Sequence, residues 1–134
     1  MKSTILSVLL AFAVTCPLMA APVAETNSTT AVQKPYRHVV LFKFKDDAKP
    51  EAVKAIEVAF LALKGKIPSV KSLEWGKNVS PEGLNDGLTH AFFVTFENKE
   101  ALEKGYLHHP DHEAFVTILK PLLDKVVVVD YVVE

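Results

Sequence analysis

Two stretches of the chain, residues 38–45 and 88–96, alternate their side chains with the two-residue period of a β-strand. In the second stretch, His90, Phe92, Val94 and Phe96 share one face. A segment at 70–79 and a valine-rich segment at 125–133 are further strand candidates. The pattern therefore predicts four strands.

Between these strands, apolar residues recur at the spacings of three and four that are typical of an amphipathic helix. The first helix begins at Pro50, which suits the first helical position, and ends at Gly65 and Pro68. Asn98 caps a second helix over 99–107. Pro110 breaks that helix, and a further helical piece covers 111–123. The apolar stripe of the first helix is Val53, Ile56, Phe60, Leu63 and Ile67.

The predicted order is β-α-β-β-α-β, which is the ferredoxin-like arrangement of the α+β class. It gives an antiparallel four-stranded sheet with helices on one face. The other face is not polar, because Val39, Leu41, Phe93, Val127 and Val129 lie on it. An apolar face without helices needs another cover, so we expect two copies to pack sheet to sheet as a homodimer.

The N-terminal part of the chain has the pattern of an export signal. Lys2 precedes an apolar run and small residues that suit cleavage, so residues 1–21 are predicted to be a signal peptide. The run is too short to span a bilayer comfortably, and no stable membrane insertion is expected after cleavage. Residues 22–35 read as a disordered linker and 36–134 as one domain. The mature protein is expected to be secreted or periplasmic.

Charge and composition exclude some classes of function. The formal net charge of −1 gives no basic footprint for nucleic acid. Cys16 is the only cysteine and falls in the predicted signal, so folding is independent of redox state. His108, His109 and Asp111 or His112 are close in sequence, but consecutive histidines point in different directions on a helix. With no cysteine or paired carboxylate to complete a set, no metal site is predicted.

The segment 105–112 is the strongest candidate for chemistry. It holds Tyr106 and three of the five histidines of the chain. Histidine titrates near physiological pH and handles protons readily. His38 and His90 each open a predicted strand, from which they could converge on this segment.

Several motifs together resemble the stress-responsive A/B barrel (Dabb) domain, over essentially all of 37–132. They are His38 to Asp46, Ile67-Pro68, Trp75 to Gly83, Gly87 to His90, Thr95-Phe96, Tyr106-x-x-His109-Pro110-x-His112 and Val129-Asp130-Tyr131. The resemblance implies a dimeric α+β barrel. The family includes plant stress proteins, bacterial members without a known role, and a polyketide cyclase that uses no cofactor.

The resemblance also implies roles for single residues. Tyr106 and His112 match the residues that carry the cyclase activity, Asp130 matches the carboxylate that orients the histidine, and His38 and His90 match pocket residues. The same residues occur in relatives without cyclase activity. One extra residue in 100–105 would rotate a helix by ~100°, unless Gly105 absorbs it.

Three functions remain open at this point. The first is a homodimeric barrel that binds a small apolar molecule in a stress-related or accessory role. The second is a cofactor-free cyclase, isomerase or lyase, in which His112 is the base, Asp130 fixes its tautomer and raises its pKa, and Tyr106 donates to a developing enolate. The third is a purely structural, assembling barrel. The predicted ligand-binding residues are His38, Val40, Phe42, Phe60, His90, Phe92, Val94, His109 and Phe115.

Overall fold

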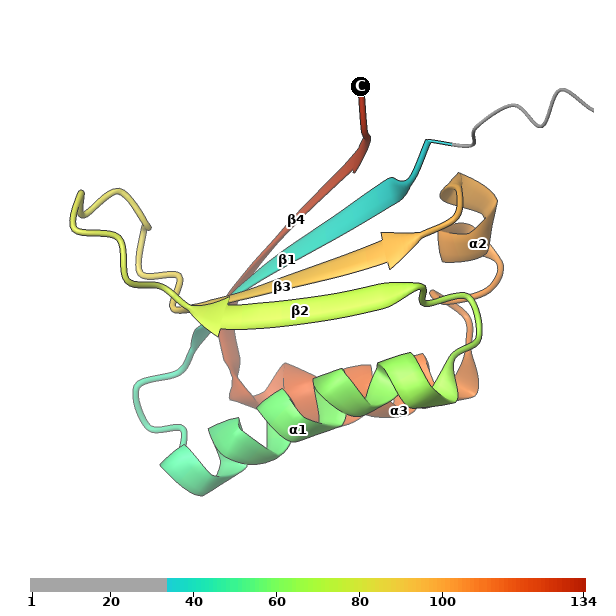
Figure 1. Ribbon diagram of the computed structural model, residues 1–134. Helices are drawn as coiled ribbons and strands as arrows, with labels where there is room; N and C mark the ends of the chain where they lie inside the picture. Colours follow the sequence, from blue (N-terminus) through green and yellow to red (C-terminus); the bar gives the residue numbers. More distant parts are fainter. Residues whose placement is uncertain (1–33) are drawn as a thin grey trace, which may run out of the picture.

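A computed structural model describes residues 34–134. The predicted signal peptide and residues 22–33 of the predicted linker lie outside the described residues. The predicted order of strands and helices is confirmed (Figure 1). The elements are β1 (Tyr36–Phe44), α1 (Pro50–Lys66), β2 (Ser72–Lys77), β3 (His90–Phe96), α2 (Lys99–Glu103), α3 (Pro110–Leu119), the 3-10 turn η1 (Lys120–Leu122) and β4 (Leu123–Val132).

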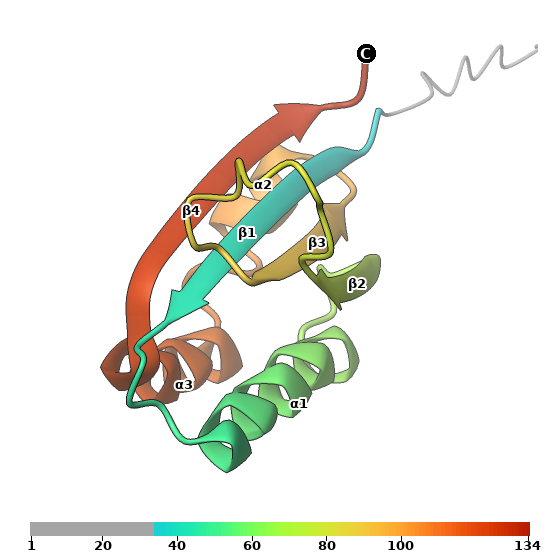
Figure 2. The same ribbon diagram turned by 90° about the vertical axis from the view of Figure 1, so that its left-hand side faces the viewer.

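The four strands form one antiparallel sheet in the order β2-β3-β1-β4. The long helices α1 and α3 lie side by side under one face of the sheet, and the opposite face carries no helix (Figures 1 and 2). The register places His38 opposite Asp130 on β4, and Lys77 opposite His90 across β2 and β3. This is the ferredoxin-like α+β fold.

Local chemistry explains where the helices begin and end. Pro50 opens α1, while Lys49 before it makes no side-chain cap. Asn98 caps α2 by accepting from the Ala101 N–H at 2.9 Å. The α2 helix ends at Glu103 rather than the predicted 107, and a turn carries the chain to His109, whose Nδ1 accepts from the Asp111 N–H at 3.2 Å and caps α3.

The core fills the layer between the sheet and the two long helices. Phe60 of α1 stacks on Phe92 with ring centroids 4.1 Å apart, and Phe115 of α3 meets Phe60 edge to face at 4.9 Å. Each fully buried side chain of this size stabilises the fold by about 1.5–3 kcal/mol. The other buried apolar residues include Val40, Phe42, Ile56, Leu63, Ile67, Val94, Phe96, Leu102, Tyr106 and Leu119.

The face of the sheet that is turned away from the helices is apolar, as the alternation predicts. Val39 and Leu41 on β1 are half-buried, while Val129 and Tyr131 on β4 are 51% and 42% exposed. The loop between β2 and β3 lies over one end of this face (Figure 2). Within residues 34–134, no helix has both the length and the apolarity that crossing a bilayer requires.

Candidate functional site

A cavity of about 250 Å³ opens between the β1–β4 side of the sheet and helix α3. Its wall is almost entirely aliphatic and aromatic, and its polar groups are Tyr106, His38 and His112, with Lys120 also among its lining residues. The remaining lining residues are Val40, Phe42, Phe60, Leu107, Phe115, Val116, Leu119, Leu123, Val126 and Val128.

Tyr106 is held in this cavity by the turn that follows α2. Its N–H donates to the Leu102 carbonyl at 3.1 Å, and its side chain is 1% exposed. Gly105 makes this turn possible, because a Cβ there would lie 2.7 Å from the Ala101 carbonyl oxygen and 2.8 Å from Ser69 Cβ. Burial raises the pKa of Tyr106 well above its usual value, so the phenol stays protonated. Gly105 thus accommodates the irregular segment before Tyr106.

His38 lies next to Tyr106 and is bonded to Asp130. The two ring centroids are 5.9 Å apart, and His38 Nδ1 is 2.6 Å from Asp130 Oδ1. A carboxylate can only accept, so Nδ1 carries the proton. When His38 is neutral, its Nε2 is therefore left with a free lone pair. The predicted pair of Asp130 with His112 is replaced by this one, because the β1–β4 register sets Asp130 directly opposite His38.

His112, in the first turn of α3, also lies against Tyr106, at a ring distance of 4.3 Å. Its Nδ1 is 3.1 Å from the Leu107 carbonyl, which can only accept, so Nδ1 is again the protonated nitrogen. Burial lowers the pKa of His112, and the Leu107 hydrogen bond opposes it without reversing it. The upward shift expected from an Asp130 partner, unless burial opposed it, is absent, because burial outweighs the hydrogen bond and Asp130 is bonded to His38 instead.

The site therefore combines a neutral phenol with two imidazoles that each bond a protein acceptor through Nδ1, so that either ring, when neutral, has a free lone pair on Nε2. In an apolar cavity such groups bind a polar atom of a ligand strongly, because water does not compete. They can also move a proton, with the phenol as donor and an imidazole as acceptor.

Only some of the other predicted binding residues line this cavity. Val40, Phe42, Phe60 and Phe115 line the cavity as predicted, whereas Phe92 and Val94 are fully buried in the core and do not line it. His109 caps α3. His90 lies at the opposite end of the layer, where its Nε2 is 3.2 Å from Glu57 Oε1, so it does not belong to this cavity.

Sequence reasoning missed several residues that line this cavity, among them Leu107, Val126 and Val128. It also missed Glu57, which lies outside the cavity and is the partner of His90. Val126 and Val128 share the helix-facing side of β4 with Asp130, so strand alternation contained this signal. Among residues 34–134, no group of three or more His, Cys, Asp or Glu side chains is placed to hold a metal ion.

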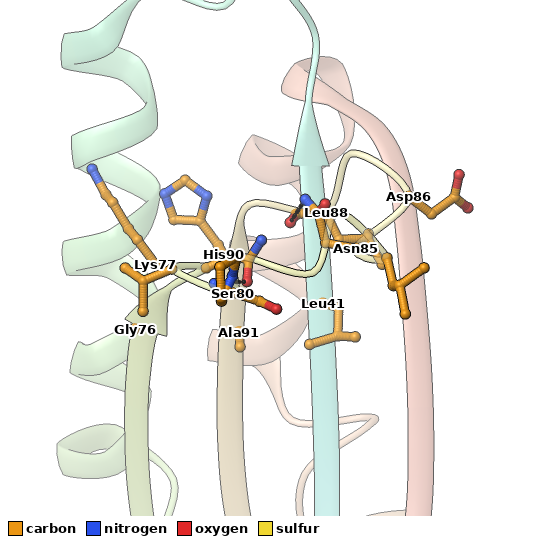
Figure 3. Close-up of a pocket in the computed structure, with 13 residues that line it drawn as sticks. Leu41, Gly76, Lys77, Ser80, Asn85, Asp86, Leu88, His90 and Ala91 are labelled. Carbon is orange, nitrogen blue, oxygen red and sulfur yellow. Dashed lines mark hydrogen bonds between the residues drawn. The ribbon is translucent and has the colours of Figure 1, made fainter.

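A second hollow, of about 720 Å³, lies on the outer face of the sheet. Figure 3 shows it between Leu41 and Ala91 on the strands and Ser80, Asn85 and Leu88 of the β2–β3 loop. It is open, and its titratable lining residues are Lys77, Asp86 and His90. It lacks the phenol and the two imidazoles of the Tyr106 cavity and belongs to the uncovered apolar face.

Comparison with known proteins places this architecture in a family. The model of the stress responsive A/B barrel domain (Dabb) matches residues 36–133. The chain belongs to this family. It is 44% identical over 97 residues to the stress-response A/B barrel domain-containing protein HS1 of Arabidopsis thaliana, covering 72% of this chain and 88% of that protein. Olivetolic acid cyclase of Cannabis sativa is 30% identical over 95 residues, covering 71% and 93%.

Solved structures support the same assignment. A hydroxynitrile lyase from Passiflora edulis superposes with a TM-score of 0.71 at 25% identity, covering 76% of this chain and 95% of that one. A dimeric ferredoxin-like protein of unknown function from Thermobifida fusca gives a TM-score of 0.65 at 26% identity, covering 75% and 92%. This chain is thus similar to proteins named as a cyclase and a lyase, and to solved structures described as dimeric.

Proposed function

We propose that this Dabb protein binds a small, largely apolar carbonyl compound in the Tyr106 cavity, as a homodimer. The volume of about 250 Å³ is just below the ~300–1,000 Å³ that is usual for ligand pockets, so the ligand is small. The aliphatic wall matches an apolar body. The Tyr106 hydroxyl is a hydrogen-bond donor in this apolar surrounding, so it suits the carbonyl oxygen of a ligand.

One observation supports a second candidate, cofactor-free acid–base catalysis in the same cavity. Each of the two imidazoles bonds a protein acceptor through Nδ1, so each neutral ring offers Nε2 as a base beside a protonated phenol. His112 Nε2 would remove a proton from the carbon next to the carbonyl, and Tyr106 would donate to the developing enolate oxygen. The relatives named as a cyclase and a lyase are consistent with such chemistry.

Deuterium exchange tests both functions together. Small ketones such as 2-heptanone and acetophenone are incubated with the protein in D₂O, and proton NMR follows both their binding and exchange at the α-carbon. Catalysis predicts exchange in wild type, its loss in His112→Gln and Tyr106→Phe, and retained binding in His112→Gln. The matched control His108→Gln, at an exposed histidine outside the cavity, should behave as wild type.

Binding without exchange would leave the protein a ligand carrier and remove the catalytic candidate. Absence of both for a broad ketone panel would contradict the proposed ligand class and favour a purely structural barrel.

The proposed dimer is supported by the uncovered apolar sheet face and by the dimeric neighbour. Leu41→Lys would place a charge in the middle of that interface and should dissociate the dimer in analytical ultracentrifugation. We also propose export, supported by the pattern of residues 1–21. Mass spectrometry should find a mature N-terminus at Ala21 or Pro22, and a cytosolic protein retaining Met1 would contradict export.

A further inference from the structure

The end of the layer remote from Tyr106 holds a cluster of titratable groups that the proposed function does not use. Its centre is Glu57 of α1, which is 2% exposed although carboxylates are seldom buried without partners. Glu57 Oε1 is 3.2 Å from His90 Nε2 and 3.3 Å from Lys77 Nζ, and Oε2 is 2.9 Å from Lys54 Nζ. Both oxygens of the carboxylate are therefore engaged.

The strand register assembles this cluster beside α1. Lys77 and His90 are a cross-strand pair of β2 and β3, and their side chains lie next to each other near α1 (Figure 3). His90 Nδ1 is 2.8 Å from the Thr89 hydroxyl, and its Nε2–H donates to Glu57. Burial lowers the pKa of His90, so the ring is neutral at pH 7. Burial also works to raise the pKa of Glu57, but its three hydrogen bonds outweigh burial and lower it.

A hollow of about 500 Å³ opens onto this cluster. Its apolar part comes from Phe44, Pro50 and Val53. Its charged part comes from Glu57 and from the lysines at 45, 54 and 77. Its remaining lining residues are Ala48, Thr89 and His90.

The charge balance of the hollow is positive. Three ammonium groups, those of Lys45, Lys54 and Lys77, line it against one carboxylate. Lys45 gives one N–H to the Pro121 carbonyl at 2.8 Å. The acidic residues nearby in the chain, Asp46, Asp47 and Glu51, do not line the hollow.

The geometry of the lysines leaves donors for a ligand. An ammonium has three N–H donors, and Lys54 and Lys77 each use one on Glu57. Their side chains are 68% and 63% exposed, so the other donors are open to solvent. Glu57 thus fixes two cations at the mouth of the hollow, beside an apolar wall.

We propose that this hollow is a second binding site, which takes a small organic anion, a carboxylate or phosphate ester with an apolar body, on Lys54 and Lys77. Glu57 is a positioning residue, because its oxygens are already occupied. An amine ligand is disfavoured, since it would have to displace an ammonium from Glu57 while lying next to the others. The apolar body would cover Phe44 and Val53, which a bare inorganic anion leaves uncovered.

The chain contains its own reporter for this site. Trp75 is its only tryptophan, its ring stacks on His90 with centroids 6.1 Å apart, and Lys54 Nζ lies 5.8 Å from the Trp75 ring. Intrinsic fluorescence is followed while wild type is titrated with benzoate and with phenyl phosphate, which distinguish the two anion types. Benzyl alcohol and inorganic phosphate test separately the need for charge and for an apolar body.

The expected result is saturable binding of benzoate or phenyl phosphate in the millimolar range, weakened by added salt. The double variant Lys54→Gln/Lys77→Gln should bind at least about tenfold more weakly, through loss of charged donors. The control Lys64→Gln, on the same helix but outside the hollow, should bind as wild type. His112→Gln should also bind as wild type. The lysine variants alter the surroundings of Trp75 and could change its fluorescence by themselves. The amide NMR shifts of Val53 and Thr89 therefore serve as an independent measurement of the same affinity.

Four outcomes would overturn the proposal. One is the absence of saturable binding by wild type, and another is equal affinity in the double variant and the Lys64→Gln control. The third is binding of benzylamine instead of benzoate with loss in Glu57→Gln, which would make the hollow a cation site. Weakening by His112→Gln would show that the probe enters the Tyr106 cavity, and would equally overturn the assignment.

Discussion

Each end of the layer between sheet and helices holds a histidine bonded to a carboxylate, but the neighbours of the two pairs differ. In the His38–Asp130 pair, the carboxylate is 31% exposed and His38 lines an apolar cavity. In the His90–Glu57 pair, the carboxylate is 3% exposed, two lysines bind it, and Thr89 occupies the second ring nitrogen. The first arrangement leaves a base for a ligand, whereas the second leaves only ammonium donors.

The comparison shows that a His–carboxylate contact does not by itself specify a chemical role. What decides it is which nitrogen remains free and whether further charges surround the carboxylate. The following predictions test the difference, from the largest expected effect to the smallest.

Removing the two carboxylates should have unequal effects on stability. Glu57→Ala leaves a buried histidine and two oriented lysines without their common partner, and should lower the free energy of unfolding by about 3 kcal/mol. Asp130→Ala removes a partly exposed partner and should cost about 1 kcal/mol. Urea denaturation measures both. Equal losses would show that the two pairs are energetically alike.

A glycine pair tests the Tyr106 end alone. Gly105→Ala forces a Cβ to 2.7 Å from the Ala101 carbonyl oxygen, and this overpacking should cost about 2 kcal/mol and displace Tyr106. Gly65→Ala, in α1, meets nothing within 4 Å and should stabilise by about 0.5–1 kcal/mol through helix propensity. Thermal unfolding measures whether each substitution lowers or raises the stability. Ketone binding should weaken only in Gly105→Ala, while benzoate binding should be unchanged in both.

The fold was predictable because it depends on patterns that are local in sequence. Strand alternation and helical spacing gave the element order, and the second apolar sheet face followed from the same alternation. The early end of α2 was not predictable in the same way, because it depends on Gly105 packing against Ser69, which is distant in sequence. The predicted apolar stripe of α1 also passed over Glu57, although its spacing from Val53 and Phe60 places it on that stripe.

The sequence allowed the residues of the site to be predicted, but not which of them are hydrogen-bonded to each other. Tyr106, His38 and His112 do line one cavity, but Asp130 was assigned to His112 by resemblance. The β1–β4 register decides this pairing, and register depends on the whole sheet rather than on a motif. His90 shares a face of β3 with core residues and was therefore assigned to the same pocket. It lies at the first residue of β3, however, and this end of the strand is remote from the Tyr106 cavity.

Acid should weaken both ends through their histidines. Burial lowers the pKa of His90 and of His112 below 6.5 in the folded state. Their contribution to stability is therefore complete above the unfolded pKa and is lost as the pH falls through the folded pKa. Between about pH 7.5 and about pH 5.5, the urea midpoint of wild type should fall, and His90→Gln and His112→Gln should each fall less.

The lowered pKa of Glu57 acts in a more acidic window. The Glu57 carboxylate stabilises the fold at pH values above its unfolded pKa of 4.5. This contribution is lost as the pH falls through the lower pKa of the folded state. Glu57→Gln should therefore reduce the slope below 4.5. It should not reduce the slope near pH 6.5, because the Glu57 charge works to raise the pKa of His90 and its loss lets burial lower that pKa further. An unchanged acid slope in Glu57→Gln would show that its carboxylate is not held in the charged form by the fold.

The finest test separates the partners of Asp130 by NMR titration of the histidine rings. Because Asp130 bonds His38 and the Leu107 carbonyl bonds His112, Asp130→Asn should change the ring nitrogen shifts of His38 and leave the tautomer of His112 unaltered. His112 should titrate below 6.5, with Nδ1 protonated in its neutral form. Asp111→Asn, which alters a carboxylate near His109 instead, is the matched control. A large change at His112 with none at His38 would restore the His112–Asp130 pair that the resemblance implied. The proposed base, His112, would then be oriented by a carboxylate rather than by the Leu107 carbonyl.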